Sequence, residues 1–170
     1  MKRLLFVDGY NIIGDWPELK TLQEKDLEGA RDMLIEKMAE YQAYTGVEVT
    51  IVFDAHMVPG LGKKYRQYEL GIIYTKEKET ADECIERLVN ETKRVDRQIY
   101  VATSDFMEQR VIFASGAYRK SARELRTEME QIEQGIRVDV EKTKTLKART
   151  KLPIDKEMAE LFEKWRRGKR

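Results

Sequence analysis

Cysteine and histidine are almost absent from this chain of 170 residues, which has one of each, Cys84 and His56. One cysteine cannot form a disulfide within the chain, so we expect a reducing compartment, the cytoplasm. One histidine excludes a metal-independent ribonuclease that uses two histidines as its acid and its base. We interpret His56 as a loop residue and Cys84 as a small core residue.

Long apolar runs are also missing. No stretch approaches the roughly 20 residues that a membrane-spanning helix needs, so we expect no membrane partner. Only four apolar residues, Leu4 to Val7, precede Asp8, and such a run is too short for a signal peptide. The phosphate-binding patterns G-x-x-x-x-G-K-[ST] and, after the first predicted strand, G-x-G-x-x-G are absent. Neither of those loops therefore supports binding of a nucleotide cofactor.

Charge of one sign is not in excess, because 32 Lys and Arg face 31 Asp and Glu and the net charge is +1. The distribution of the charges is more informative than their sum. The segment 142–151 holds five basic residues and no acidic one, a composition typical of an arm that contacts phosphates. The alternative is a solvated linker, which charge runs more often are.

Apolar patterning predicts an α/β fold with a mostly parallel sheet. Continuous apolar runs such as Leu4–Val7 are typical of strands buried on both faces. They alternate with amphipathic helices, which indicates βαβ units whose strand C-termini share one edge. We predict one domain over 1–134 and a basic extension over 135–170 whose short terminal helix packs on that domain, with a monomer as the simplest assembly. The predicted strands are 4–7, 47–53, 70–74 and 98–102; the predicted helices are 26–44, 80–94, 106–114, 121–134 and 155–167.

Helix-capping signals support several of these boundaries. Asp26 is a predicted N-cap, and Gly46 stands where a helix commonly ends in a left-handed residue. Thr80 with Glu83 has the capping-box spacing, and Ser121 with Glu124 repeats it. The segment 55–65, which is rich in glycine, is predicted to be a loop.

Aspartates stand where the predicted strands end. Asp8, Asp54 and Asp105 each follow a strand, and Asp82 lies in the first turn of the helix after another, so all four map to one edge of the sheet. Clustered carboxylates repel one another unless a cation compensates them. Oxygen ligands suit Mg²⁺ or Mn²⁺, and such a metal can activate water for phosphodiester cleavage.

Each aspartate also has an ordinary structural alternative. Asp8 and Asp54 can be turn residues, Asp105 can cap a helix, and the helix dipole favours Asp82 in its first turn. Asn11, predicted in the same loop as Asp8, can close a turn or orient a carboxylate or a phosphate.

Basic residues near the predicted active edge and in the extension are candidate RNA contacts. Some follow the second strand, some flank the helix N-terminus at Ser121, where anions commonly bind, and the rest belong to the basic extension. The candidates are Lys63, Lys64, Arg66, Arg119, Lys120, Arg123, Lys142, Lys144, Lys147, Arg149 and Lys151.

Several motifs in order resemble the YacP-like subgroup of the NYN branch of PIN-like nucleases. The resemblance covers nearly the whole chain and is carried by the segments 7–13, 52–55, 79–82, 102–105, 119–125 and 162–168. It implies a PIN-like three-layer sandwich with C-terminal helices. It also implies an Mg²⁺- or Mn²⁺-dependent endoribonuclease that cuts mRNA in the decoding site of translating ribosomes. The implied catalytic group is Asp8, Asp54, Asp82, Asp105 and Asn11, with Asp8, Asp82 and Asp105 as metal ligands.

Three functions stay open at this point. The first is hydrolysis of RNA by metal-activated water, leaving a 3′-hydroxyl and a 5′-phosphate. The second is a non-catalytic module that binds RNA or the ribosome. The third is a metal-dependent phosphatase or a flap nuclease acting on DNA.

Overall fold

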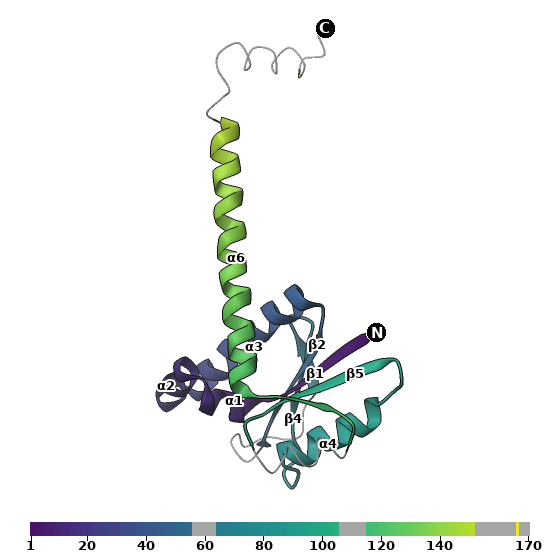
Figure 1. The fold of residues 1–170 in the computed structure, drawn as a ribbon. Coiled ribbons are helices and arrows are strands. Elements are labelled where there is room, and N and C mark those ends of the chain that lie inside the picture. Colours follow the sequence, from purple (N-terminus) through teal and green to yellow (C-terminus); the bar gives the residue numbers. More distant parts are fainter. Residues whose placement is uncertain (56–63, 106–114, 152–165, 167–170) are drawn as a thin grey trace. The chain divides into compact units, whose positions relative to one another are not determined.

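A six-stranded sheet forms the centre of the computed structural model (Figure 1), which describes residues 1–55, 64–105, 115–151 and 166. The chain divides into two units, Met1–Ile132 and Glu133–Arg170. The strands are β1 (Lys2–Asp8), β2 (Glu48–Phe53), β3 (Lys64–Gln67), β4 (Leu70–Tyr74), β5 (Arg97–Ala102) and β6 (Tyr118–Lys120). The helices are α1 (Gly9–Asp15), α2 (Pro17–Lys25), α3 (Leu27–Thr45), α4 (Ala81–Thr92) and α6 (Ala122–Lys151).

The strand order β3-β4-β2-β1-β5-β6 places β1 between the two halves of the sheet. From β1 the chain builds outward through β2 and β4, and then returns to add β5 and β6 on the other side. Every pairing is parallel except β3 with β4. The order therefore reverses between β1 and β5, and in sheets of this kind ligands bind outside the C-terminal strand ends at such a point.

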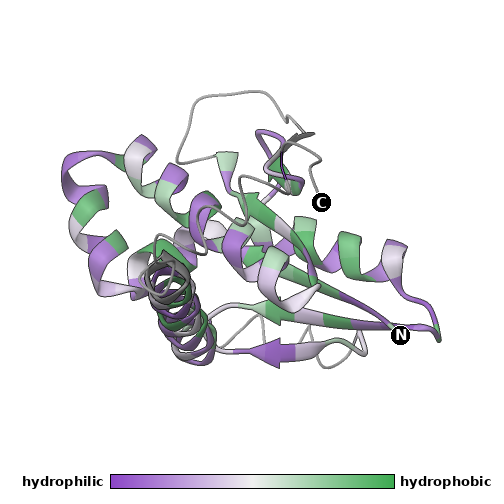
Figure 2. Ribbon diagram, turned by 90° about the horizontal axis from the view of Figure 1, so that it is seen from above, coloured by the Kyte–Doolittle hydropathy of each residue, from purple (hydrophilic) through white to green (hydrophobic). Residues whose placement is uncertain are grey.

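Alternation along the strands builds a core on each face of the sheet. Leu5 and Val7 belong to the cluster that α1, α2, α3 and the first turns of α6 cover, whereas Leu4 and Phe6 belong to the cluster that α4 covers. Figure 1 shows α4 on the opposite side of the sheet from α1, α2 and α3, and Figure 2 shows apolar residues concentrated in the strands. The predicted α/β sandwich with a mostly parallel sheet is confirmed.

The capping predictions are confirmed. The Asp26 carboxylate accepts a hydrogen bond from the Gly29 N–H, and Gly46 ends α3 with φ of 75°. The Thr80 hydroxyl oxygen accepts from the Glu83 N–H, and the Ser121 hydroxyl oxygen accepts from the Glu124 N–H. All four strands predicted from apolar runs are present, and their ends differ from the predicted ones by at most two residues.

Four elements were not predicted, namely α1, α2, β3 and β6. The segment of α1 is short and carries two glycines and two isoleucines, so its helix propensity is low. The one local sign of α2 is Pro17 at the first helical position, a common place for proline, and no strong apolar pattern follows it. Strand β3 begins at Lys64, inside the predicted loop 55–65, and β6 has only three residues. Both are edge strands, which depend on pairing with a neighbour.

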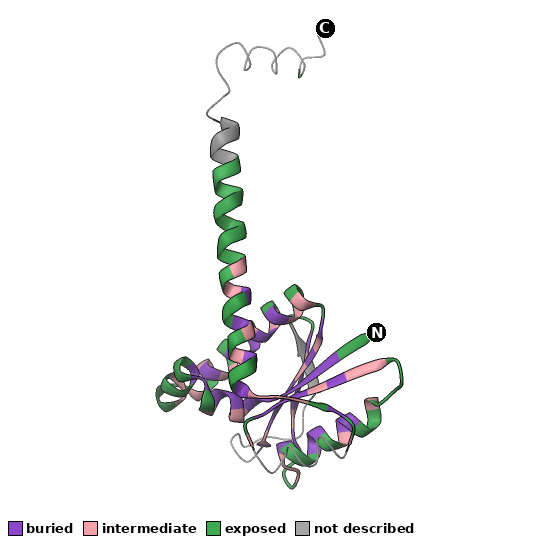
Figure 3. Ribbon diagram, in the orientation of Figure 1, coloured by how far each residue is buried: buried purple, intermediate pink, exposed green. Residues whose placement is uncertain are grey.

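The predicted end of the helix at residue 134 is wrong, because α6 continues to Lys151. Gly135 lies inside this helix, where a glycine costs only about 1 kcal/mol and does not stop it. Pro153 is the first residue that cannot continue the helix without loss of a hydrogen bond. Residues 137–146 of α6 are exposed (Figure 3). The basic stretch is thus helical, not an extended arm.

Two predictions lie outside the described residues, the helix 106–114 and most of the terminal helix 155–167, of which Arg166 alone is described and is helical. His56 also lies outside them. Cys84 is a residue of α4 and is buried in the core that this helix covers, as predicted. Within the described part of the chain, no helix has the length and apolar character needed to cross a membrane.

Candidate active site

The strand register brings three of the predicted aspartates to the point where the sheet order reverses. Asp8 ends β1 with its Cα paired to Val52 of β2, and on its other side Val7 pairs with Ala102 of β5. Asp54 and Asp105 therefore each lie two residues beyond the level of Asp8, one on either side of it. The parallel strands create this arrangement, since all their C-termini leave the sheet at one edge.

Asp8 is buried, with 8% of its surface exposed, and its side chain does not cap the helix that follows. It occupies the N-cap position of α1, yet no capping hydrogen bond reaches its carboxylate. Alternation with Leu4 and Phe6 turns it toward the face that α4 covers. The Asp8 side chain therefore does not act as a cap of α1.

Asp54 and Asp82 meet at the N-terminus of α4. The Asp54 Oδ2 atom accepts a hydrogen bond of 3.3 Å from the N–H of Ala81, the first residue of α4. Asp82 is the next residue and is exposed. The positive end of the helix dipole thus faces two carboxylates. This contact places Asp82 at the same edge as the three aspartates that follow strands.

Asn11 joins the two halves of the sheet, and it does so from α1, not from the predicted loop. Its Oδ1 atom accepts hydrogen bonds from the N–H of Ser104 at 2.6 Å and from the Ser104 hydroxyl at 2.8 Å. The hydroxyl oxygen of Thr103, which is fully buried, accepts from the N–H of Asp105 at 3.1 Å. Asn11 and Thr103 therefore hold the segment that carries Asp105 beside the end of β1.

Gly9 lets the start of α1 lie directly against the end of β2. A Cβ atom at this position would stand 2.4 Å from Cε1 of Phe53 and 3.1 Å from the carbonyl oxygen of Val52. Phe53 directly precedes Asp54, so this close approach sets the spacing between Asp8 and Asp54. At Asp8 the sequence indicates only an ordinary turn, because no local pattern signals a contact with a residue as far along the chain as Phe53.

The donors at this edge are carboxylate oxygens, which fit Mg²⁺ or Mn²⁺. In the parts of the chain that are described, no three His, Cys, Asp or Glu side chains are grouped as a metal site. A fully formed protein cage is also not what Mg²⁺ usually takes, because it keeps several waters and binds one or two carboxylates. The predicted ligands Asp8, Asp82 and Asp105 are all described, and the structure does not group the three of them closely enough to form such a site.

The predicted RNA contacts divide by what the structure describes of them. Arg119 lies on β6 and Arg123 is exposed in the first turn of α6, at the C-terminal edge of the sheet. Lys142 and Lys144 are exposed on α6. Lys63 lies outside the described residues. Only the backbone is described for the remaining residues, which are Lys64 and Arg66 in β3 and Lys147, Arg149 and Lys151 in α6.

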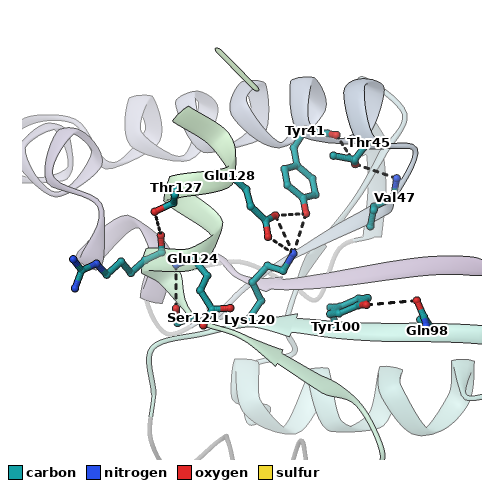
Figure 4. Close-up of polar contacts among 11 residues, drawn as sticks. Tyr41, Thr45, Val47, Gln98, Tyr100, Lys120, Ser121, Glu124, Thr127 and Glu128 are labelled. Atoms are coloured by element: carbon teal, nitrogen blue, oxygen red, sulfur yellow. Dashed lines mark hydrogen bonds and ion pairs between the residues drawn. The ribbon is translucent and has the colours of Figure 1, made fainter. Parts of the chain in front are cut away.

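Lys120 has a structural contact that takes it out of the set of candidate RNA contacts (Figure 4). Its ammonium donates to both carboxylate oxygens of Glu128, at 2.7 and 2.9 Å, and to the Tyr41 hydroxyl at 3.2 Å. Burial lowers the pKa of Lys120, but the hydrogen bonds from Glu128 and Tyr41 outweigh it and leave the pKa above its ordinary 10.5. The cluster ties β6 and α6 to α3.

Replacing Glu128 by glutamine is expected to lower the free energy of unfolding by about 2 kcal/mol. Removal of one partner of a buried ion pair costs about 3–5 kcal/mol, and the 38% exposure of the Glu128 side chain reduces that effect. Urea unfolding measures it. Because the folded-state pKa of Lys120 is raised, the stabilisation is present below pH ~10 and is lost as the pH rises further.

Glu130→Gln is the matched control for this change. Glu130 is two residues further along α6, pairs with Arg126 at 3.4 Å and has a side chain that is 59% exposed. Its loss is expected to cost less than about 0.5 kcal/mol. Equal losses for the two variants, or a Glu128→Gln deficit that persists at high pH, would contradict the role given to the cluster.

The fold and the strand-end aspartates define an α/β protein of the NYN domain class. The profile of the YacP-like NYN domain matches residues 5–167, and the chain belongs to that family. It is 53% identical over 165 residues to YacP of Bacillus subtilis (strain 168), covering 97% of both chains.

The comparison with solved structures agrees with this family. The chain is similar to the crystal structure of Rae1 (YacP) from Bacillus subtilis, with a TM-score of 0.76, 53% identity and coverage of 97% of this chain and 95% of that one. A tryptophan-to-leucine mutant of the same protein matches with a TM-score of 0.75 and 52% identity, over 83% of this chain and 82% of that one.

Proposed function

We propose that this protein is a metal-dependent endoribonuclease that cleaves RNA by attack of an activated water, and that it acts on mRNA at translating ribosomes in the cytoplasm. The observation that carries the proposal is the position of Asp8 between Asp54 and Asp105 where the sheet order reverses. Membership of the YacP-like NYN family suggests a nuclease role for that edge.

Asp8, Asp82 and Asp105 are the proposed ligands of Mg²⁺ or Mn²⁺. When bound, such an ion lowers the pKa of a coordinated water and offsets charge that develops on the phosphate. Asp54 is given a different task, to orient the attacking water, because the N–H of Ala81 binds its Oδ2 atom and holds the carboxylate at the start of α4. Asn11 keeps Asp105 in place through Ser104.

Exposed basic groups apart from the aspartates would bind the RNA backbone. Arg123 is exposed at the N-terminus of α6, where backbone N–H groups also favour a phosphate. Lys142 and Lys144 are exposed on the later turns of the same helix. Contacts of this kind bind the RNA backbone independently of sequence. They serve equally for ribosomal RNA, in keeping with the proposed ribosome partner.

Removal of the metal is expected to abolish cleavage. A labelled RNA is incubated with the protein, with the protein in EDTA, and with EDTA-treated protein resupplied with Mg²⁺ or Mn²⁺; in parallel the protein is added to ribosomes translating the same RNA, which themselves need Mg²⁺. We expect cuts only when metal is present, with a 3′-hydroxyl and a 5′-phosphate at each cut. The same labelled sequence made as free RNA and as DNA shows whether the ribosome is required and whether DNA is a substrate.

Two outcomes would reject the proposal. A cyclic phosphate at the cut would indicate attack by the RNA 2′-hydroxyl and not by water. Sedimentation of the protein with ribosomes, without any metal-dependent cut, would favour the alternative of a non-catalytic module that binds RNA or the ribosome.

A further inference from the structure

Helix α3 begins at the same edge of the sheet as the aspartates. It connects the C-terminal end of β1, by way of α1 and α2, to the start of the parallel strand β2, and so it runs opposite to the strands. Its first turns therefore lie beside the C-terminal strand ends. Arg31 is in the second turn, half-buried, and it reaches back to α1.

The guanidinium of Arg31 has one hydrogen-bond partner among the described residues, and the charge of the exposed Glu28, three residues earlier in α3, also acts on it. Its Nη1 atom donates a hydrogen bond of 3.3 Å to the Tyr10 hydroxyl. Tyr10 lies in α1, two residues after Asp8, and its ring packs on Phe53 with a centroid distance of 5.1 Å. An arginine side chain has five N–H donors, so most of those on Arg31 remain available to a ligand. Lys120 differs, because a carboxylate already neutralises it.

The position of Tyr10 links Arg31 to the acidic edge. Tyr10 follows Asp8 by two residues, and its ring packs on Phe53, the residue directly before Asp54. The Arg31 guanidinium, which is hydrogen-bonded to the Tyr10 hydroxyl, therefore lies beside the segments that carry Asp8 and Asp54.

A phosphate is the ligand that this arrangement fits. Guanidinium groups bind phosphate oxygens through two parallel N–H donors, and a rigid support improves that geometry. The acidic edge would repel the RNA backbone unless cations outside the metal site offset the repulsion. We propose that Arg31 is a positioning residue that binds an RNA phosphate beside the one cleaved, with Tyr10 holding the guanidinium in place. This inference rests on the proposed ribonuclease function.

Arg31→Gln is expected to raise KM for ribosome-bound mRNA by about tenfold and to change kcat by less than about threefold, since the lost contact is the same before and during the reaction. Binding of a labelled single-stranded RNA 12-mer is measured in the Asp8→Asn background, to prevent cleavage. The slope of log K against log[KCl] should fall by about 0.7, the value for one phosphate contact on a single strand. Arg31→Lys should restore the slope but only part of the affinity.

Arg97→Gln is the matched control. Arg97 is also half-buried and has one hydrogen bond, to the Thr92 carbonyl at 3.0 Å, but it lies at the N-terminal end of β5, on the opposite edge of the sheet. It is expected to behave as the wild type in KM and in salt slope. The inference is overturned if Arg31→Gln matches this control in KM and in salt slope. It is also overturned if Arg31→Gln lowers both kcat and thermal stability while KM stays unchanged, or if the 12-mer does not bind at 50 mM KCl.

The outcomes also separate this inference from the proposed function. If Asp8→Asn abolishes cleavage and Arg31→Gln has no effect, only the role of Arg31 is rejected. If Asp8→Asn cleaves as well as the wild type, the ribonuclease proposal itself is rejected.

Discussion

Asp8→Asn is expected to reduce the cleavage rate constant by about 1,000-fold while the fold remains intact. Asparagine has the same shape but lacks the negative charge that a metal ligand supplies at this edge, and loss of metal-assisted charge stabilisation is worth about 4 kcal/mol of activation free energy. Asp8 is buried, and Asp54 and Asp105 follow the flanking strands two residues beyond its level, so removal of its charge should not lower the midpoint of thermal unfolding. Single-turnover cleavage of ribosome-bound mRNA measures the effect.

Asp15→Asn provides the comparison for this variant. Asp15 is exposed at the end of α1, on the same helix that Asp8 precedes, and the substitution makes the same change of charge. Its cleavage rate should stay within about twofold of the wild type. Similar rates for the two variants would show that Asp8 has no part in catalysis.

Gly9→Ala is expected to lower the free energy of unfolding by about 2–3 kcal/mol and to lower the cleavage rate as well. The added Cβ would stand 2.4 Å from Phe53, and insertion of an atom into a packed core typically costs about 1–3 kcal/mol. Separation of α1 from β2 also moves Asp8 away from Asp54, and a displacement of about 1 Å in an active site can cost about 100-fold in rate. Urea unfolding and cleavage assays on the same preparation measure both effects.

Gly14→Ala is the control that separates the clash of Gly9→Ala with Phe53 from the general effect of replacing a glycine by alanine. Gly14 lies five positions further in α1, and a Cβ there would meet no atom within 4 Å. Alanine in the interior of a helix is expected to stabilise the protein by about 0.5–1 kcal/mol. If both variants are stabilised, the contact between Gly9 and Phe53 does not constrain the fold.

The core strands and the helix caps could be predicted because the signals that encode them are local. The apolar run Leu4–Val7 identifies a buried strand without reference to the rest of the chain. Asp26, Thr80 and Ser121 each bind an N–H three residues further on, so their spacing is visible in the sequence. For the same reason three aspartates could be assigned to strand ends, and the parallel topology brought them to one edge.

Predictions failed or were missing where a distant partner decides the conformation. The edge strands β3 and β6 form by pairing with β4 and β5, and α1 forms in spite of low propensity because its isoleucines are buried in the core. The end of α6 was predicted at residue 134, whereas the helix continues to Lys151.

The sequence alone determined which residues carry charge to the active edge, since strand ends, caps and acidic residues follow one another within a few positions. Only the tertiary structure decided how these residues are used. It shows the hydrogen bonds of Asn11 with Ser104, of Lys120 with Glu128 and Tyr41, and of Arg31 with the Tyr10 hydroxyl. Apart from the pair Lys120 and Glu128, which are eight residues apart, these contacts join segments that are distant in the chain. Packing of the sheet against its helices, not any local pattern, brings them within hydrogen-bonding distance.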